Sequence, residues 1–339
     1  MKSAEEFQAF YQSTLVPVVE ALEAERKKLA KNIYVAGAIA IGFIILYSSL
    51  NKATVVEQQL GPNGPTGTSY SGGWTNALFY VAIAGALGYF FWFRPKSKAF
   101  RARFKGEVIA RVVKFYDENL NYSPEAGISR REFMDSTIFD TAGDRYRCED
   151  LVSGKIGSTD IRFSEVHTER KQEVKSQDSS SGFKRYVTLF RGLVFIADFN
   201  KHFKGRTMVL TDQAEKSLGG LGTMFQRMNA QRDPLVKMEN TDFEKAFVVY
   251  ASDAVEANYI LTPSLMERIL QLRAKLGAIQ LAFYNSVVFI SIPWKEDLFE
   301  AGIFQSLTDS PMDKYFQQLQ LFAGIVEELN LNTRVWTKA

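Results

Sequence analysis

Two long apolar runs without a charged residue constrain this chain more than any other feature. Ile33–Leu50 reads IYVAGAIAIGFIILYSSL and Trp74–Phe93 reads WTNALFYVAIAGALGYFFWF. A helix needs about 20 apolar residues to cross roughly 30 Å of hydrocarbon, and Tyr and Trp flank both runs as they do at membrane interfaces. We therefore predict a transmembrane hairpin of helices 33–50 and 74–93, in preference to two buried helices of a soluble core.

The charges around these runs predict their orientation. Lys and Arg crowd the outer ends of both runs, whereas the connection 51–73 holds only Lys52 and Glu57. Because Lys and Arg are retained on the cytoplasmic side, both termini are expected in the cytoplasm and the Gly/Pro-rich connection outside it. Small residues four apart, such as Ala36 and Ala40, predict close packing of the two helices or an oligomeric contact.

A basic cluster follows the second run. It comprises Arg94, Lys96, Lys98, Arg101, Arg103 and Lys105. We expect it to open a basic amphipathic juxtamembrane helix over 94–121. Anionic lipid headgroups would attract these side chains by about 1 kcal/mol each, but the same residues would also serve as ordinary topogenic charge.

The segment 1–32, before the first run, is predicted to be an amphipathic cytoplasmic helix with a break near Pro17. Its apolar residues recur at three- and four-residue steps: Phe7, Tyr11, Leu15, Val18 and Leu22. This stripe either packs on the chain's own domain or the membrane, or binds a helical partner. The candidates for partner binding are Leu15, Val18 and Leu22.

The remaining residues, 122–339, predict one cytoplasmic α+β domain. Ser129 caps a short helix, Thr262 and Pro263 begin a helix that ends at Gly277, and Ser310 with Pro311 begins a C-terminal helix. β-rich or alternating runs predict strands over 161–174, 186–199, 206–210, 243–250, 278–284 and 287–292. Hairpins interrupted by helices indicate a mostly antiparallel sheet closed by a C-terminal helix. A pleckstrin-homology-like barrel is the alternative.

No catalytic, cofactor or metal motif is present in the sequence. The single cysteine, Cys148, excludes an intrachain disulfide and a cysteine-rich zinc site, and His167 and His202 belong to no zinc motif. The glycine-rich residues 219–222 lack the lysine of a phosphate-binding loop and predict a loop only. With 41 basic and 38 acidic residues, the chain lacks the basic excess of a nucleic-acid-binding protein. We therefore favour a non-enzymatic role.

Two weaker features point to an anion. A turn that presents backbone N–H groups beside cations, as Lys201, His202, Lys204 and Arg206 do, could bind one or could be a solvated hairpin tip. Arg191 falls on an apolar face of its strand. Either a bulge at Gly192 turns it outward, or it is buried and paired with a carboxylate.

The stretch FRGLVFIADFNKHFKGR at Phe190–Arg206, together with FEKAFVVYASDAVEANYILT at Phe243–Thr262, resembles a bacterial two-span membrane protein family of unknown function, DUF family 3137. The resemblance implies the bacterial plasma (inner) membrane as the location. Members are often encoded beside LemA-type proteins, which implies such a protein as a partner of the N-terminal helix.

The expected function is that of a membrane-anchored cytoplasmic scaffold or adaptor within a membrane complex. It would contact membrane lipids and recruit a LemA-type protein or a second copy of this chain, without nucleic acid or cofactor. The alternatives are a lipid or ligand sensor, or an enzyme with a site of dispersed residues. Clustered Asp and Glu in a polar pocket near Arg191 or His202 would favour the alternatives.

Overall fold

The computed structural model describes residues 2–59, 73–174, 183–211, 233–308 and 312–332. The chain divides into two compact units, which we call the sheet unit and the helical unit. The sheet unit contains Met1–Phe10, Ile109–Glu300 and Met312–Ala339, and the helical unit contains Tyr11–Val108 and Ala301–Pro311. The chain therefore passes between the two units four times.

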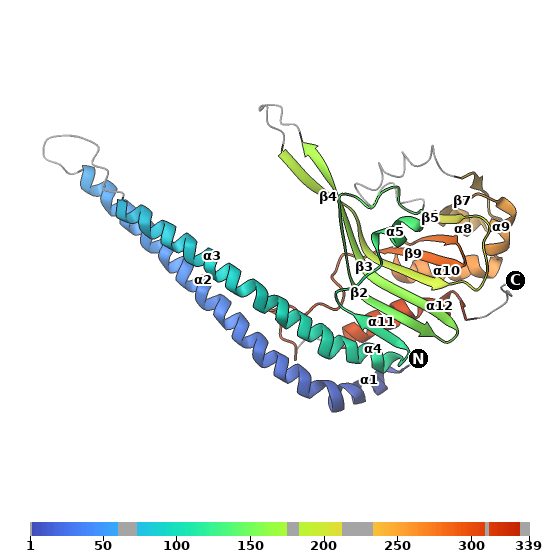
Figure 1. The fold of residues 1–339 in the computed structure, drawn as a ribbon, viewed down its shortest axis with the longest axis horizontal. Coiled ribbons are helices and arrows are strands. Elements are labelled where there is room, and N and C mark those ends of the chain that lie inside the picture. Colours follow the sequence, from blue (N-terminus) through green and yellow to red (C-terminus); the bar gives the residue numbers. More distant parts are fainter. Residues whose placement is uncertain (1, 60–72, 175–182, 212–232, 309–311, 333–339) are drawn as a thin grey trace. The chain divides into compact units, whose positions relative to one another are not determined.

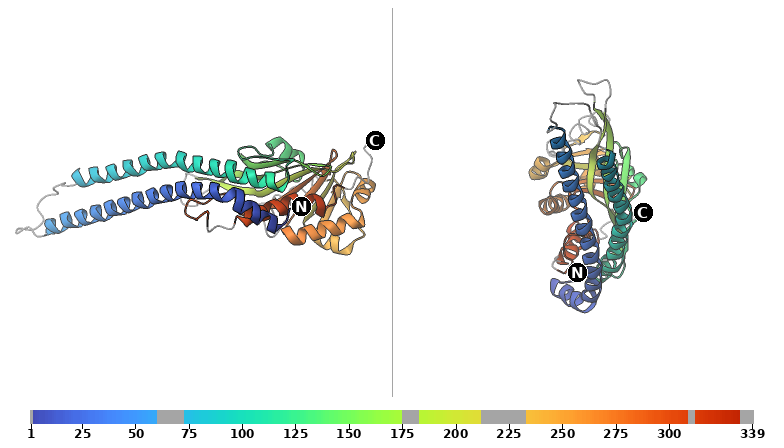
Figure 2. Two further views of the ribbon diagram at one scale, coloured as in Figure 1. Left: turned by 90° about the horizontal axis from the view of Figure 1, so that it is seen from below. Right: turned by 90° about the vertical axis from the view of Figure 1, so that its left-hand side faces the viewer.

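Two long helices, α2 (Val16–Gln59) and α3 (Gly73–Phe104), make up most of the helical unit. They lie side by side along their length (Figure 2). Pro17 lies in the first turn of α2, and the π-helical turn η1 (Tyr11–Leu15) precedes it in place of the predicted break. Helix α2 runs on to Gln59, into the stretch expected to be a loop. Pro95 does not end α3, and the same helix continues to Phe104, as expected for a helix that runs on past residue 94.

The first helical stretch is long and apolar enough to cross a membrane. The stretch Ala4–Ser48 contains an 18-residue window with a mean hydropathy of 1.9, and 11% of that window is buried. Large apolar side chains are exposed on both long helices: Tyr34, Val35, Ile39, Ile41, Ile44 and Ile45 on α2, and Tyr80, Val81, Ile83 and Phe91 on α3.

A buried ion pair at the start of α2 binds a distant segment of the chain. Arg26 donates two hydrogen bonds of 2.7 Å to the carboxylate of Glu23, and both residues are buried. Arg26 Nη1 also donates to the carbonyl of Ile303 at 2.6 Å, and the N–H of Leu307 donates to Glu23 at 2.9 Å. The segment around residues 303–307 is thereby held against α2.

The sheet unit is built on one antiparallel sheet (Figure 1). Its described strands follow the order β1-β2-β3-β4-β9-β8-β5-β7-β6. The strands are β1 (Leu120–Ser123), β2 (Arg145–Ile156), β3 (Thr159–Val174), β4 (Phe183–Asp198), β5 (Thr207–Thr211), β6 (Leu235–Val236), β7 (Phe247–Ala251), β8 (Gln280–Tyr284) and β9 (Val287–Pro293). This confirms the α+β class with a large antiparallel sheet. No pairing joins β1 to β6 among the described strands, so the alternative of a pleckstrin-homology-like barrel is wrong.

The helices of the sheet unit connect or cover these strands. They are α1 (Ala4–Phe10), α4 (Ala110–Tyr116), α5 (Arg130–Asp135), α8 (Thr241–Ala246), α9 (Ala254–Ile260), α10 (Pro263–Leu276), α11 (Asp313–Ala323) and α12 (Ile325–Glu328), with the π-helical turn η2 (Lys105–Ile109) before α4. The helix that leaves α3 thus ends at Tyr116, and residues 120–121 already belong to β1.

Local sequence signals account for several element ends. Ser129 and Glu132 form the capping box of α5, and the hydroxyl of Thr262 accepts from the N–H of Leu265 at the start of α10. Asn285 and Ser286 both have positive φ, which matches the tight turn of the β8–β9 hairpin. The predicted cap at Ser310 and Pro311 lies outside the described residues.

The prediction of one strand over 243–250 is wrong. Asn240 accepts hydrogen bonds from the N–H groups of Asp242 and Phe243, so it caps α8, and the strand β7 begins only at Phe247. An N-cap residue supplies the acceptor that the first turn of a helix lacks, and here this local bond overrides the β-rich composition.

Each face of the sheet packs on aromatic side chains. One face carries the core cluster around Phe133, Phe139 and Phe190, with α5 covering it. On the other, Phe163 of β3 meets Phe322 of α11 at a ring distance of 6.1 Å. Helix α1 joins this second layer, because the ring of Phe7 stacks on Phe316 of α11 at 4.4 Å.

Replacing Arg26 with Ala should strongly destabilise the protein, because the buried Glu23 then keeps only the exposed Lys27, at 3.8 Å, as a counter-charge. Breaking a buried pair costs about 3–5 kcal/mol. The thermal midpoint of the full-length protein in detergent should fall by many degrees. Lys28 is exposed two residues after Arg26, so Lys28→Ala is the control and should change stability by less than about 0.5 kcal/mol. Equal midpoints for both variants would contradict the role given to the pair.

Candidate functional site

A β-bulge in β2 places acidic side chains next to one another. Glu149 pairs with Glu165 of β3, and the next pair is Val152 with Phe163, so β2 carries one extra residue between them. Asp150, within this bulge, has a φ of 62°, a left-handed conformation that Asp tolerates better than most residues. Bulges re-aim side chains and are frequent beside functional sites. Here the bulge inserts a third carboxylate beside a directly opposed pair.

The segment after β9 brings two more carboxylates to this place. Asp297 forms an ion pair with Arg191 of β4, and the N–H of Leu298 donates to Glu165 at 2.9 Å. Glu300 follows two residues later, and its carbonyl accepts a hydrogen bond of 2.8 Å from the hydroxyl of Tyr315 on α11. We call Glu149, Asp150, Glu165, Asp297 and Glu300 the acidic cluster.

Tyr122 of β1 closes the acidic cluster on one side. Its hydroxyl donates a hydrogen bond to Asp150, and its ring meets the ring of Phe299 edge-on at 5.8 Å. Burial and the neighbouring Asp150 raise the pKa of Tyr122 far above its usual value. Tyr122 therefore remains a hydrogen-bond donor to Asp150 throughout the physiological pH range.

Three members of the acidic cluster have the arrangement of cation ligands. One carboxylate oxygen from each of Glu149, Asp150 and Glu300 lies within 4.8 Å of the other two. Asp150 is 1% exposed, Glu300 is half-buried and Glu149 is exposed. Carboxylate oxygens are the ligands that Mg²⁺ and Ca²⁺ prefer, so these are the described residues that could hold such an ion.

The negative charges of the acidic cluster repel one another, and protonation of one carboxylate relieves this repulsion as a bound cation would. Glu165 is 7% exposed, and its burial is the main reason that its pKa is raised to about 7. The Leu298 N–H opposes this rise, while the negative charges of Asp297, Glu149 and Asp150 add to it. The acidic cluster therefore gains or loses a proton near neutral pH.

Arg191, predicted as a weak anion-site residue, lies at the edge of the acidic cluster. Its side chain is half-exposed and paired with Asp297. The bulge in β4 is at Leu189 and not at Gly192, because the register shifts between the pairs Thr168–Phe190 and Glu169–Thr188. Neither predicted alternative is found as stated, because Arg191 is paired with a carboxylate but is half-exposed and not buried.

The turn that was a weak candidate for binding an anion, or a solvated hairpin tip, holds a carboxylate of the same chain. The N–H groups of Lys204 and Gly205 donate to Glu256 at 3.0 and 2.8 Å. Arg206 donates to Asp233 at 2.8 Å, and His202 Nδ1 lies 3.2 Å from the hydroxyl of Ser286. The ammonium of Lys201 lies 3.5 Å from the ring centre of Tyr259. The structure does not bring this turn to Arg191 as one site.

The other predicted site residues belong to the helical unit. Arg94, Lys96, Lys98, Arg101 and Arg103 are exposed, but Lys105 is buried, so it does not belong to an exposed basic surface. Arg103 pairs with Glu25 and Glu107. In the N-terminal stripe Leu15 and Leu22 are buried and Val18 is half-buried. Residues 219–222 lie outside the described part of the chain.

The comparisons with known proteins support part of the resemblance. Residues 188–331 match the model of a family described as "Protein of unknown function (DUF3137)". The match begins in β4 and ends just after α12, so the C-terminal half of the sheet is similar to that family. The structure titled "crystal structure of the mycobacterial trehalose monomycolate transport factor A, TtfA" is similar with a TM-score of 0.35 and 8% identity, over 68% of this chain and 98% of that chain. No curated protein matches the chain.

Glu165→Gln should change how stability depends on pH. A pKa raised from 4.5 to about 7 means that the neutral form stabilises the fold fully below about pH 4.5, and that this contribution is lost as pH rises through 7. The variant should match the wild type near pH 4.5 and exceed it above pH 7 by up to about 3 kcal/mol. Chemical denaturation at a series of pH values measures this difference.

Glu173→Gln is the matched control, because Glu173 is exposed on the same strand. Its pH profile should follow that of the wild type. Parallel profiles for Glu165→Gln and the wild type would show that Glu165 is ionised in the folded protein.

Proposed function

We propose that this protein is a membrane-anchored cytoplasmic scaffold. In this proposal α2 and α3 both cross the bilayer, both termini are cytoplasmic, and the sheet unit binds a protein partner. Exposed apolar side chains along both helices support the two spans. No carboxylate occurs within residues 26–56 or 58–106, and the basic residues gather at one end of the pair, as the positive-inside rule requires.

The main support for this proposal is the number of connections between the helical unit and the sheet unit. The chain passes between the two units four times, where a simple tether would need one passage. The buried pair Glu23 and Arg26 holds the segment around 303–307, which comes from the C-terminal third of the sequence, to the base of α2. An anchor of this kind suits a protein that must present its domain at a membrane.

The partner in this proposal is a LemA-type protein, as the resemblance implies, or a second copy of this chain. Because Leu15 and Leu22 are buried, they are not accessible to a partner, and we propose that the partner binds outside the N-terminal stripe. Helix α9 exposes Val255 and Tyr259, which are 80% and 49% exposed and lie one turn apart. Tyr is enriched among the residues that contribute most of the binding energy at protein contacts, so Tyr259 is the main candidate on this helix.

The topology is tested with reporters. A reporter that is active only outside the cytoplasm should be active when inserted after Gly64 and inactive at either terminus. A reporter that needs the cytoplasm should give the opposite pattern. Activity of the first reporter at the C-terminus would overturn the two-span topology.

The partner surface is tested by Val255→Asp combined with Tyr259→Ser in the full-length protein. Placing a carboxylate in an apolar contact costs several kcal/mol, so these changes should release the bound partner and leave the thermal midpoint unchanged. Ala254→Asp, at the start of the same helix, is the control and should retain the partner. Retention by the double variant would exclude α9 as the contact.

A further inference from the structure

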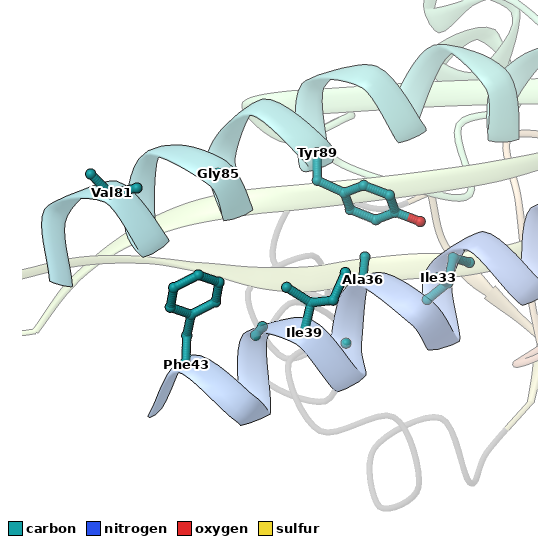
Figure 3. A pocket seen from close by; sticks show the side chains of 9 residues that line it. Ile33, Ala36, Ile39, Phe43, Val81, Gly85 and Tyr89 are labelled. Atoms are coloured by element: carbon teal, nitrogen blue, oxygen red, sulfur yellow. The ribbon is translucent and has the colours of Figure 1, made fainter. Parts of the chain in front are cut away.

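A cavity of about 540 Å³ lies between α2 and α3 (Figure 3). Both helices contribute to its wall, with Ile33, Phe43, Val81 and Tyr89 near its ends and small residues between them. This volume is within the usual range for a ligand-binding pocket. The wall is apolar apart from the hydroxyl of Tyr89.

Two of the small residues in this wall, Gly37 and Gly85, do not serve close packing of the two helices. A Cβ atom added at Gly37 or Gly85 would have no heavy atom within 4 Å. Small residues at a tight helix contact would instead meet the neighbouring backbone. Gly37 and Gly85 therefore face space that an apolar group can fill.

Tyr89 adds one polar requirement at one end of the cavity. Its hydroxyl is buried and has no hydrogen-bond partner in the described structure, and Figure 3 shows the ring between the two helices with the hydroxyl toward the Ile33 end. A buried hydroxyl is unfavourable unless it is hydrogen-bonded. The best occupant is therefore apolar over most of its length and carries an oxygen acceptor at this end.

The charge beyond that end identifies the occupant further. From Ile33, α2 continues back to Lys31, and from Tyr89, α3 continues to Lys96, seven residues or about 10 Å along the axis. Both lysines are exposed, and the ammonium of Lys96 lies 3.6 Å from the ring centre of Trp92. The sequence has no carboxylate within 30 residues after Glu25 or within 40 residues before Glu107. An anionic group would therefore complement the positive charge of Lys31 and Lys96.

We propose that the cavity binds one acyl chain of an anionic glycerophospholipid from the cytoplasmic leaflet. The chain lies along Gly37 and Gly85, the ester carbonyl accepts a hydrogen bond from Tyr89, and the phosphate lies between Lys31 and Lys96. This proposal rests on the proposed two-span topology, which places this end of the cavity at the cytoplasmic face.

The test uses the full-length protein, delipidated in detergent and then mixed with phosphatidylglycerol or phosphatidylcholine of the same acyl chains. Native mass spectrometry measures the lipid bound to each chain. The wild type should retain phosphatidylglycerol at least about tenfold better, which is 1.4 kcal/mol. Lys31→Gln with Lys96→Gln should abolish this preference, and Tyr89→Phe should weaken retention of both lipids.

Gly37→Leu and Gly85→Leu should fill the cavity and expel the lipid without unfolding the protein. Gly42 is the matched control, because a Cβ there also meets nothing within 4 Å and the residue lies outside the cavity wall. Gly42→Leu should retain the lipid. Equal retention by Gly85→Leu and Gly42→Leu would overturn the proposal, as would a Gly85→Leu variant that changes only the fraction of dimer, since a second copy would then be the occupant.

The reporter after Gly64, measured in the same variants, separates the two proposals. An active reporter with no lipid preference overturns the lipid site alone. An inactive reporter overturns the topology on which the site rests.

Discussion

The helical unit depends on the buried ion pair between Glu23 and Arg26. Two charges with exposures of 4% and 7% are tolerated only where the surrounding groups satisfy them. Two hydrogen bonds join the pair, and the remaining capacity is filled by the Ile303 carbonyl and the Leu307 N–H. Apolar side chains in the same place would pack on many surfaces, but these charges require one particular stretch of backbone. The pair therefore specifies which segment lies against α2.

The same stretch of chain also satisfies a buried carboxylate in the sheet unit. The N–H of Leu298 donates to Glu165, and nine residues later the N–H of Leu307 donates to Glu23. Each unit thus holds one end of a short segment through a glutamate that is otherwise unfavourable in its surroundings. A charged acceptor strengthens a hydrogen bond, so the bond to Leu298 weakens when Glu165 takes up a proton.

The sequence predicted the features that local rules determine. The caps at Ser129 and Thr262, the turn at Asn285 and Ser286, and the strands with clear alternation were all found. The strand at 243–250 failed because the single hydrogen-bond acceptor of Asn240 decides between helix and strand there. The acidic cluster was not predicted, since Glu149 and Glu300 are brought together by a strand register and a bulge that sequence spacing does not reveal. Glu165 left no signal either, because Ser164 and His167 make its surroundings in the sequence polar.

The role of a glycine in this chain depends on its neighbours in space, which the sequence alone does not give. In β4, a Cβ at Gly192 would lie 2.1 Å from the carbonyl oxygen of Ile292, so glycine is required there for β4 and β9 to approach. In α2 and α3, a Cβ at Gly37 or Gly85 would meet nothing, so glycine there leaves space. The spacing of Ala36 and Ala40 predicted close packing of the two helices or an oligomeric contact, and it gave no prediction for Gly37 or Gly85. The second role becomes visible only when the positions of both helices are known, because the space beside Gly37 and Gly85 depends on the distance between them.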